Sequence, residues 1–195
     1  MREWEQARSY YQQALEIFIE YGDRFSQAST LHQLGNLAQE VGELSQARSY
    51  YQQALEIKIE YGDRYEQAGT LHQLGNLAQE LREWEQARSY YRQALEIKIE
   101  YGAAGGTQSA RYEQAKTLNN LGIVAQEVGE LSQAKSYYLQ ALQIRAEFND
   151  NYTIQTFSLP LLVALYQQTQ DEEIFVAVAD ILGVGVEEVR GLLEG

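Results

Sequence analysis

The sequence contains no cysteine and a single proline, Pro160, among its 195 residues. Without cysteine, neither a disulfide-stabilised scaffold nor a thiolate metal site can form, which is compatible with a reducing compartment. The longest apolar runs, such as residues 159–166, are too short to span a bilayer, and the charged first ten residues do not resemble a signal peptide. We therefore expect a soluble, cytoplasmic protein.

Basic residues are scarce as well. The chain has 15 Lys and Arg against 28 Asp and Glu, which gives a net charge of −13. This charge repels phosphates and anionic lipid headgroups, so neither nucleic acid nor a membrane surface is expected as the main partner. A neutral or basic protein or peptide is the partner that the charge favours.

What the sequence does contain is a repeat. The ten residues LHQLGNLAQE occur at residues 31–40 and again, unchanged, at residues 71–80. The same offset of 40 residues aligns segment 43–51 with segment 83–91, and a further copy begins 47 residues after the latter, at Glu130. Periods of 20 to 50 residues are typical of stacked units of secondary structure that cannot bury their apolar faces alone.

The apolar spacing within one unit predicts two helices. Leu31, Leu34 and Leu37 form one stripe at helical spacing, and Ala47 and Tyr51 begin a second stripe after a short turn. No segment alternates apolar and polar residues as a half-buried strand does, so almost no sheet is expected.

The helix ends have their own signals. Gly42 and Gly62 follow the two helices, where a left-handed C-terminal cap suits glycine. Asp63 precedes the next helix, and Glu66 stands three residues later, which is the pattern of a capping box.

These residues resemble the tetratricopeptide repeat (TPR) pattern, although Leu replaces its usual Trp and no proline closes the second helix. The matching positions are Leu31, Leu34, Gly35, Ala38, Ala47, Tyr51 and Ala54, then Leu71, Leu74, Gly75, Ala78, Ala87, Tyr91 and Ala94, then Leu118, Leu121, Gly122, Ala125, Ala134, Tyr138 and Ala141. In this pattern the small residues let paired helices approach, and the tyrosine fills the space between neighbouring units. The 40-residue period is similar to the repeats of kinesin light chain, of spindle-orientation adaptors and of the sensor arrays of bacterial NB-ARC signalling ATPases.

The resemblance implies an all-α fold, a right-handed α-solenoid of stacked antiparallel helix pairs that ends in a degenerate helical cap. We expect one domain over residues 1–195, composed of the second helix of a truncated unit (1–22), repeats at 23–62, 63–102 and 111–149, an insertion loop at 103–110, and a degenerate unit with the cap at 150–195. Helices are expected at about 152–168, 171–182 and 186–193 in the last segment. Because the chain begins at a second helix, we also expect an N-terminal edge that pairs with something, for example a second copy.

We expect function from the side chains of the repeat that are not needed for packing. His32, Asn36 and Glu40 recur every four residues and so form one stripe on the first helix of a unit. The resemblance implies that first helices line a concave groove, where amides suit an extended peptide backbone and glutamates suit a basic ligand. The predicted groove residues are His32, Gln33, Asn36, Gln39, Glu40, His72, Gln73, Asn76, Gln79, Glu80, Asn119, Asn120, Ile123 and Glu127.

No chemistry or cofactor is expected. The glycine-rich segment 102–110 lacks the lysine of a phosphate-binding loop and follows a helix rather than a strand. His32 and His72 could begin a zinc site, but Asn119 takes their place in the next copy and no third ligand is evident. No serine lies in a nucleophile motif, and therefore we expect a non-catalytic interaction module.

Two other functions stay open. The chain could be an assembly or sensor segment of a larger signalling protein that self-associates edge to edge. Alternatively, the tail at 177–195 has a helix-turn-helix character, although Glu187 and Glu188 outnumber Arg190 on the helix that would enter DNA.

Overall fold

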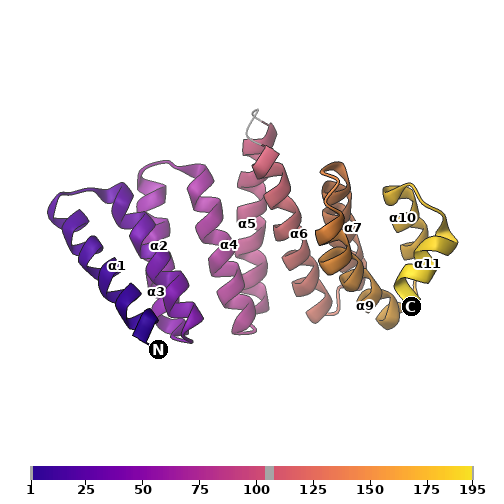
Figure 1. The fold of residues 1–195 in the computed structure, drawn as a ribbon, viewed down its shortest axis with the longest axis horizontal. Helices are drawn as coiled ribbons and strands as arrows, with labels where there is room; N and C mark the ends of the chain where they lie inside the picture. Colours follow the sequence, from indigo (N-terminus) through magenta and orange to yellow (C-terminus); the bar gives the residue numbers. More distant parts are fainter. Residues whose placement is uncertain (1, 104–107, 195) are drawn as a thin grey trace. The chain divides into compact units, whose positions relative to one another are not determined.

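The computed structural model describes residues 2–103 and 108–194, which are helices joined by short turns, without a strand. The helices form two compact units, residues 1–97 and 98–195, and the division falls within α5, the helix so labelled in Figure 1. Residues 1–97 contain α1 (Arg2–Glu20), α2 (Arg24–Glu40), α3 (Leu44–Glu60), α4 (Arg64–Glu80) and most of α5 (Trp84–Ala103). Residues 98–195 contain α6 (Gln108–Glu127), α7 (Leu131–Glu147), α8 (Asn151–Thr153), the π-helical η1 (Ile154–Ser158), α9 (Leu159–Thr169), α10 (Glu173–Leu182) and α11 (Val186–Glu194).

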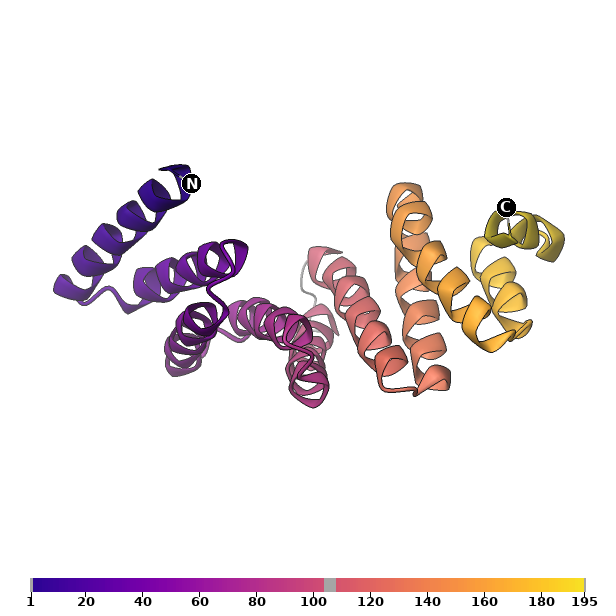
Figure 2. The same cartoon turned by 90° about the horizontal axis from the view of Figure 1, so that it is seen from below.

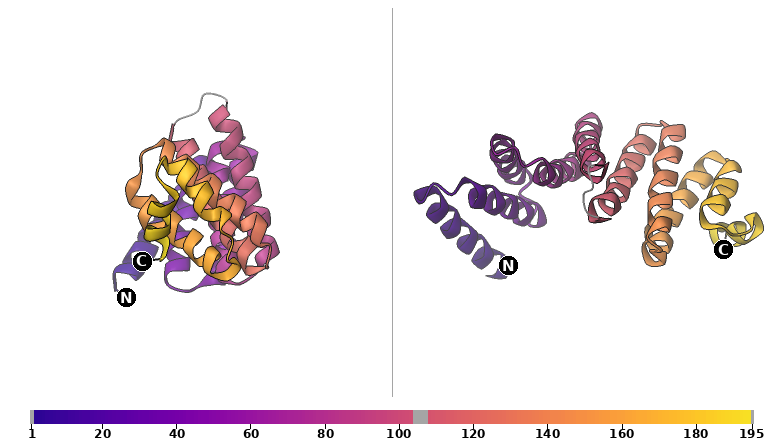
Figure 3. Two further views of the ribbon diagram at one scale, coloured as in Figure 1. Left: turned by 90° about the vertical axis from the view of Figure 1, so that its right-hand side faces the viewer. Right: turned by 90° about the horizontal axis from the view of Figure 1, so that it is seen from above.

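Within each unit, helices that follow one another in the chain lie side by side, as Figures 2 and 3 show for the pairs α2/α3 and α6/α7. The predicted helix pairs are therefore confirmed. The assignment of all 195 residues to one domain stays a prediction.

A glycine and a tyrosine determine how closely the two helices of a pair approach. The ring of Tyr51 on α3 is fully buried, and it packs in one apolar cluster with Leu74 and Leu77 of α4. A Cβ atom added to Gly35 of α2 would lie 2.5 Å from a ring carbon of Tyr51, closer than real contacts allow. Only glycine at this position lets the ring enter, so the roles expected for the small residue and the tyrosine are confirmed.

The helix ends confirm the predicted caps in part. Gly42 and Gly62 have left-handed backbones, with φ of +82° and +68°. The Asp63 carboxylate accepts a hydrogen bond from the Glu66 amide at 3.1 Å, as a capping box requires. The second hydrogen bond of a capping box, from the Asp63 amide to the Glu66 carboxylate, is not formed, so this part of the prediction is wrong. The Glu66 carboxylate accepts from the ammonium of Lys58 instead, and the Asp63 amide donates to the Lys58 carbonyl.

Arg82 has the left-handed backbone that Gly42 has one repeat earlier, with φ of +57°. A Cβ atom is unfavourable in this conformation, and therefore Arg82→Gly should raise the free energy of unfolding by about 0.5–1 kcal/mol. Urea denaturation followed by circular dichroism would measure the change. The reverse substitution, Gly42→Arg, is the matched control and should lower stability, and a destabilised Arg82→Gly protein would contradict the argument.

The insertion and the C-terminal segment differ from expectation in detail. The described ends of the loop predicted at 103–110 are helical, because Ala103 ends α5 and Gln108 begins α6. Ala110 is fully buried. Residues 104–107 lie outside the described residues. The helix expected at 152–168 is divided into α8, η1 and α9, because Pro160 cannot donate a helical hydrogen bond and follows a wider π turn. The helices expected at 171–182 and 186–193 are confirmed as α10 and α11.

Candidate interaction surface on the first helices

The predicted groove residues come from α2 and α4 in the first unit and from α6 in the second. The glutamates are exposed, and most of the amides are half-buried. His72 and Asn119 are only 4% and 5% exposed, so the expectation that they stand on an open surface is wrong. Whether the remaining residues bind a ligand stays a prediction.

Side-chain amides join α2 to α4 in one continuous chain. Asn76 donates to Gln73 at 2.6 Å, Gln73 donates to Asn36 at 2.9 Å, and Asn36 donates to Gln33 at 3.3 Å. Each bond runs from a side-chain nitrogen to a side-chain oxygen, so the amides hold one another in fixed orientations. The surface of α2 and α4 is therefore ordered before any ligand arrives.

Two of these amides also serve the core. The Tyr51 hydroxyl lies 2.8 Å from the oxygen of Asn36, and the Tyr91 hydroxyl lies at the same distance from Asn76. Gln39 and Gln79 offer each hydroxyl a second acceptor. A buried tyrosine needs such an acceptor. The assumption that Asn36 and Asn76 are unnecessary for packing is therefore wrong.

The second unit keeps the glutamine acceptor but not the asparagine acceptor. Ile123 stands at the position of Asn36 and cannot accept, and so the Tyr138 hydroxyl donates to Gln126 at 2.9 Å. Gln126 in turn donates to Gln168 on α9 at 2.9 Å. Sequence reasoning missed Gln126, although its alignment with Gln39 was a signal that could have found it.

The glutamates that end the first helices carry negative charge close to this surface. Gln39 donates to Glu80 at 3.0 Å. Burial, and then the charges of Glu40 and Glu80, raise the pKa of Tyr51. An anion at a helix C-terminus is unfavourable, and within the described part of the chain neither Glu40 nor Glu80 forms an ion pair with a basic residue. Apart from the hydrogen bond that Glu80 accepts from Gln39, no contact among the described residues gives these two charges a stabilising partner.

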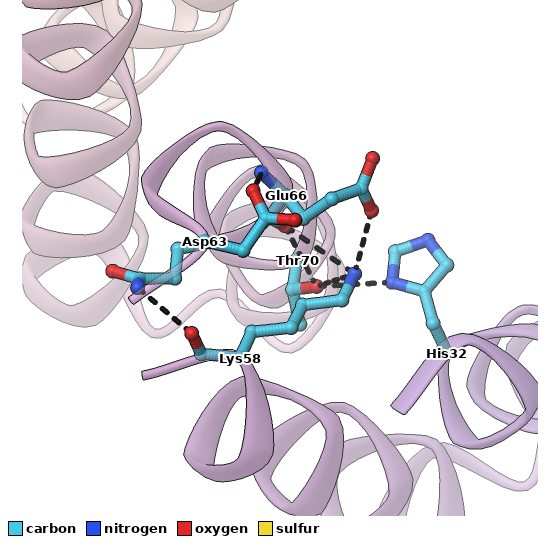
Figure 4. A network of polar contacts seen from close by, with 6 residues as sticks. His32, Lys58, Asp63, Glu66 and Thr70 are labelled. Atoms are coloured by element: carbon cyan, nitrogen blue, oxygen red, sulfur yellow. Dashed lines mark hydrogen bonds and ion pairs between the residues drawn. The ribbon is translucent and has the colours of Figure 1, made fainter. Parts of the chain in front are cut away.

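His32 belongs to a structural network that joins three helices (Figure 4). Its Nδ1 lies 3.2 Å from the Thr70 hydroxyl, which also accepts from the Lys58 ammonium at 3.0 Å. Lys58 in turn forms an ion pair with Glu66 at 3.0 Å. Burial, and then the charge of Lys58, lower the pKa of His32 to about 4, so the ring is neutral at neutral pH.

The described residues contain no group of three or more potential metal-ligating side chains, and no helix among them is long and apolar enough to cross a membrane.

The helix pairs, the buried tyrosine and its glycine recur with the spacing that the sequence shows. A tetratricopeptide repeat family model matches residues 1–60, 26–100 and 66–147. The chain belongs to the tetratricopeptide repeat family. The resemblance on which the fold was predicted is confirmed, and the all-α solenoid architecture of TPR proteins applies to this chain.

Solved TPR structures have the same fold. BtubC (BKLC) from P. vanneervenii has a TM-score of 0.77 and 24% identity, and the match covers 99% of this chain and 75% of that one. A kinesin-light-chain-type protein of Podosopora anserina with nearly identical TPR-like repeats has a TM-score of 0.65 and 18% identity, with 98% and 93% covered. MamA has a TM-score of 0.56 and 15% identity, with 91% and 92% covered.

A comparison with curated proteins finds no significant match. TPR repeats generally form scaffolds for protein–protein interaction, and this TPR chain has that general character.

Proposed function

We propose that this TPR protein binds an extended, basic segment of a partner protein along the surface formed by α2 and α4, and that it catalyses no reaction. The observation that carries the proposal is the pair Glu40 and Glu80. Both are exposed, both end a first helix where an anion disfavours the fold, and neither forms an ion pair within the described residues. A basic ligand would make these charges favourable.

The amide chain between the glutamates supports an extended ligand. An extended peptide presents alternating N–H and C=O groups, and a side-chain amide can satisfy both kinds. The amide nitrogen of Gln73 carries two hydrogens, of which Asn36 accepts one. Gln33 is exposed, and its oxygen accepts from Asn36. Because these groups are already ordered, a ligand would lose little side-chain entropy on binding.

Charge reversal tests the proposal and leaves Asn36 and Asn76, which accept from the two tyrosine hydroxyls, in place. A library of displayed twelve-residue peptides would be selected on the wild-type chain, and the strongest binder would be measured by titration calorimetry. We expect Lys or Arg in that peptide, and the double variant Glu40→Lys, Glu80→Lys should bind it about tenfold more weakly or worse. Wild-type affinity should fall as salt rises, because exposed charges are screened.

The matched control is Glu16→Lys, Glu56→Lys. Both glutamates are exposed on second helices, α1 and α3, and the double change alters the net charge by the same amount. Circular dichroism would confirm that both variants are helical. If the control variant lost as much binding, the loss would be due to net charge and not to these two positions. If the Glu40→Lys, Glu80→Lys protein bound as tightly as wild type, the binding surface would lie elsewhere.

Self-association through α1 is the second candidate function, and one observation favours it. Tyr10, Ile17, Ile19 and Tyr21 are each at least half-exposed on or directly after α1. Exposed apolar groups of this kind invite association. Sedimentation velocity over a wide concentration range would detect it, and a strictly monomeric protein would exclude it.

DNA binding by the tail gains no support. Arg190 of α11 pairs with Glu172 at 2.6 Å, and its guanidinium lies 4.7 Å from the centre of the Phe175 ring. Glu187 and Glu188 are exposed on the same helix.

A further inference from the structure

Three of the second helices carry a buried cation near their C-terminal end, at one repeat position. This position holds Lys58 in α3, Lys98 in α5 and Arg145 in α7, which are 6%, 4% and 7% exposed. A buried charge is costly unless a counter-charge and hydrogen bonds accompany it. We therefore compare the counter-charge and the hydrogen bonds that accompany each of the three cations.

The two lysines each have a carboxylate and a hydroxyl. The Lys58 ammonium lies 3.0 Å from the Glu66 carboxylate and 3.0 Å from the Thr70 hydroxyl. The Lys98 ammonium lies 3.6 Å from the Glu113 carboxylate and 2.9 Å from the Thr117 hydroxyl. The side chains of Glu66 and Glu113 are 49% and 40% exposed, so each carboxylate reaches its buried lysine from the solvent side.

Arg145 has a hydroxyl group as a partner, as the two lysines do, but no carboxylate. Its Nη1 donates to the Ser158 hydroxyl at 2.6 Å. With its amide oxygen turned toward the guanidinium, Asn119 accepts from both terminal nitrogens at 2.9 and 3.1 Å. Within the part of the chain that the structure describes, no carboxylate forms an ion pair with Arg145, and its buried Nε has no hydrogen-bond partner.

Thr153 stands where the other copies have a glutamate. The Thr153 amide is capped by the Asp150 carboxylate at 3.1 Å, just as the Glu66 amide is capped by Asp63 at 3.1 Å. The shared cap places Thr153 and Glu66 at the same point of their helices. Threonine is shorter than glutamate and uncharged, and so it cannot neutralise Arg145.

The neighbouring acid does not replace the missing one. Asp150 accepts hydrogen bonds from the hydroxyls of Thr153 and Tyr112, which lower its pKa. Its charge acts on Arg145 only at a distance, and burial still lowers the pKa of Arg145. An arginine side chain stays protonated under such conditions. The result is a buried, charged guanidinium with one free donor.

We propose that Arg145, with Asn119 and Ser158, binds the carboxylate group of a ligand at the place that Glu66 and Glu113 fill in the other copies. The free Nε–H and the planar guanidinium suit a carboxylate, which forms short, charge-assisted hydrogen bonds with arginine. The site lies in residues 98–195 and is independent of the peptide surface proposed on α2 and α4.

Acetate is the probe, and the chain supplies its own matched variants. Thermal unfolding would be followed by circular dichroism in sodium acetate and in sodium chloride at equal ionic strength and neutral pH. In wild-type protein, acetate should raise the Tm above its value in chloride by about 2–4 °C, the shift that corresponds to partial saturation of one weak site. Thr153→Glu should raise the Tm in chloride and abolish the additional effect of acetate, whereas Thr153→Gln should not raise it.

Glu113→Thr creates a second cation without its carboxylate, at Lys98. This variant should have a lower Tm in chloride and a larger acetate effect than wild type, which keeps the proposal testable even if Thr153→Glu fails to fold.

An acetyl-dipeptide with a free C-terminal carboxylate distinguishes two kinds of ligand. It should bind more tightly than acetate if the natural ligand is a peptide, and no more tightly if the natural ligand is a small acid. The same dipeptide with an amidated C-terminus should have no effect. Equal Tm values for wild type in acetate and chloride, a full acetate effect in Thr153→Glu, or tighter binding of inorganic phosphate would each overturn the assignment.

Discussion

Replacing Gly75 with alanine should lower the free energy of unfolding by about 2–3 kcal/mol, the range typical of overpacking in a well-ordered core. The added Cβ atom would lie 2.5 and 2.6 Å from two ring carbons of Tyr91. The ring is fully buried, and its hydroxyl is held by Asn76 at 2.8 Å, so it cannot move away without breaking that hydrogen bond. The helix pair therefore has to separate.

Gly69 supplies the control within the same helix. It is exposed, a Cβ atom there would meet nothing within 4 Å, and its backbone is not left-handed. Gly69→Ala should raise stability by about 0.5–1 kcal/mol, since alanine is the better helix former. Urea denaturation of both variants would measure the difference. If both changes shifted stability in the same direction, close packing of α4 on the Tyr91 ring would not explain the glycine at position 75.

Stability should also fall as the pH is lowered from about 7 to 5, because of His32. Its folded pKa of about 4 lies below the ordinary value of 6.5, so between these values the unfolded chain binds a proton that the folded chain does not. The stability that neutral His32 contributes is therefore complete above pH 6.5 and is lost as the pH falls toward 4. The full shift sets an upper limit of about 3 kcal/mol, and partial exposure of the ring reduces the loss expected at pH 5 to about 1–2 kcal/mol.

His32→Asn isolates this contribution, because asparagine stands at the equivalent position, Asn119. The charged groups that act on His32 are Lys58 of α3 and Glu66 of α4, and neither changes in the variant. The difference in unfolding free energy between wild type and His32→Asn should shrink between pH 7 and pH 5 when measured by urea denaturation. A difference that is independent of pH would show that His32 is not held neutral by burial and by Lys58.

The repeat period, the helix pairs and the left-handed caps at Gly42 and Gly62 could be predicted from the sequence. These features are local, because a helical stripe or a capping glycine depends on residues within a few positions of it. They are also repeated, so that each copy supported the interpretation of the next. The packing of Tyr51 against Gly35 followed from the TPR resemblance, which covers both positions.

The tertiary structure alone decided which polar side chains have a structural role. Asn36 looked free for a ligand, but its oxygen accepts from Tyr51 on the next helix and from Gln73 in the next repeat. Glu66 looked like half of a capping box, but Lys58 attracts its carboxylate from α3. Contacts between side chains on different helices depend on the direction of each side chain in the folded protein. The helical periodicity of one segment therefore cannot predict them.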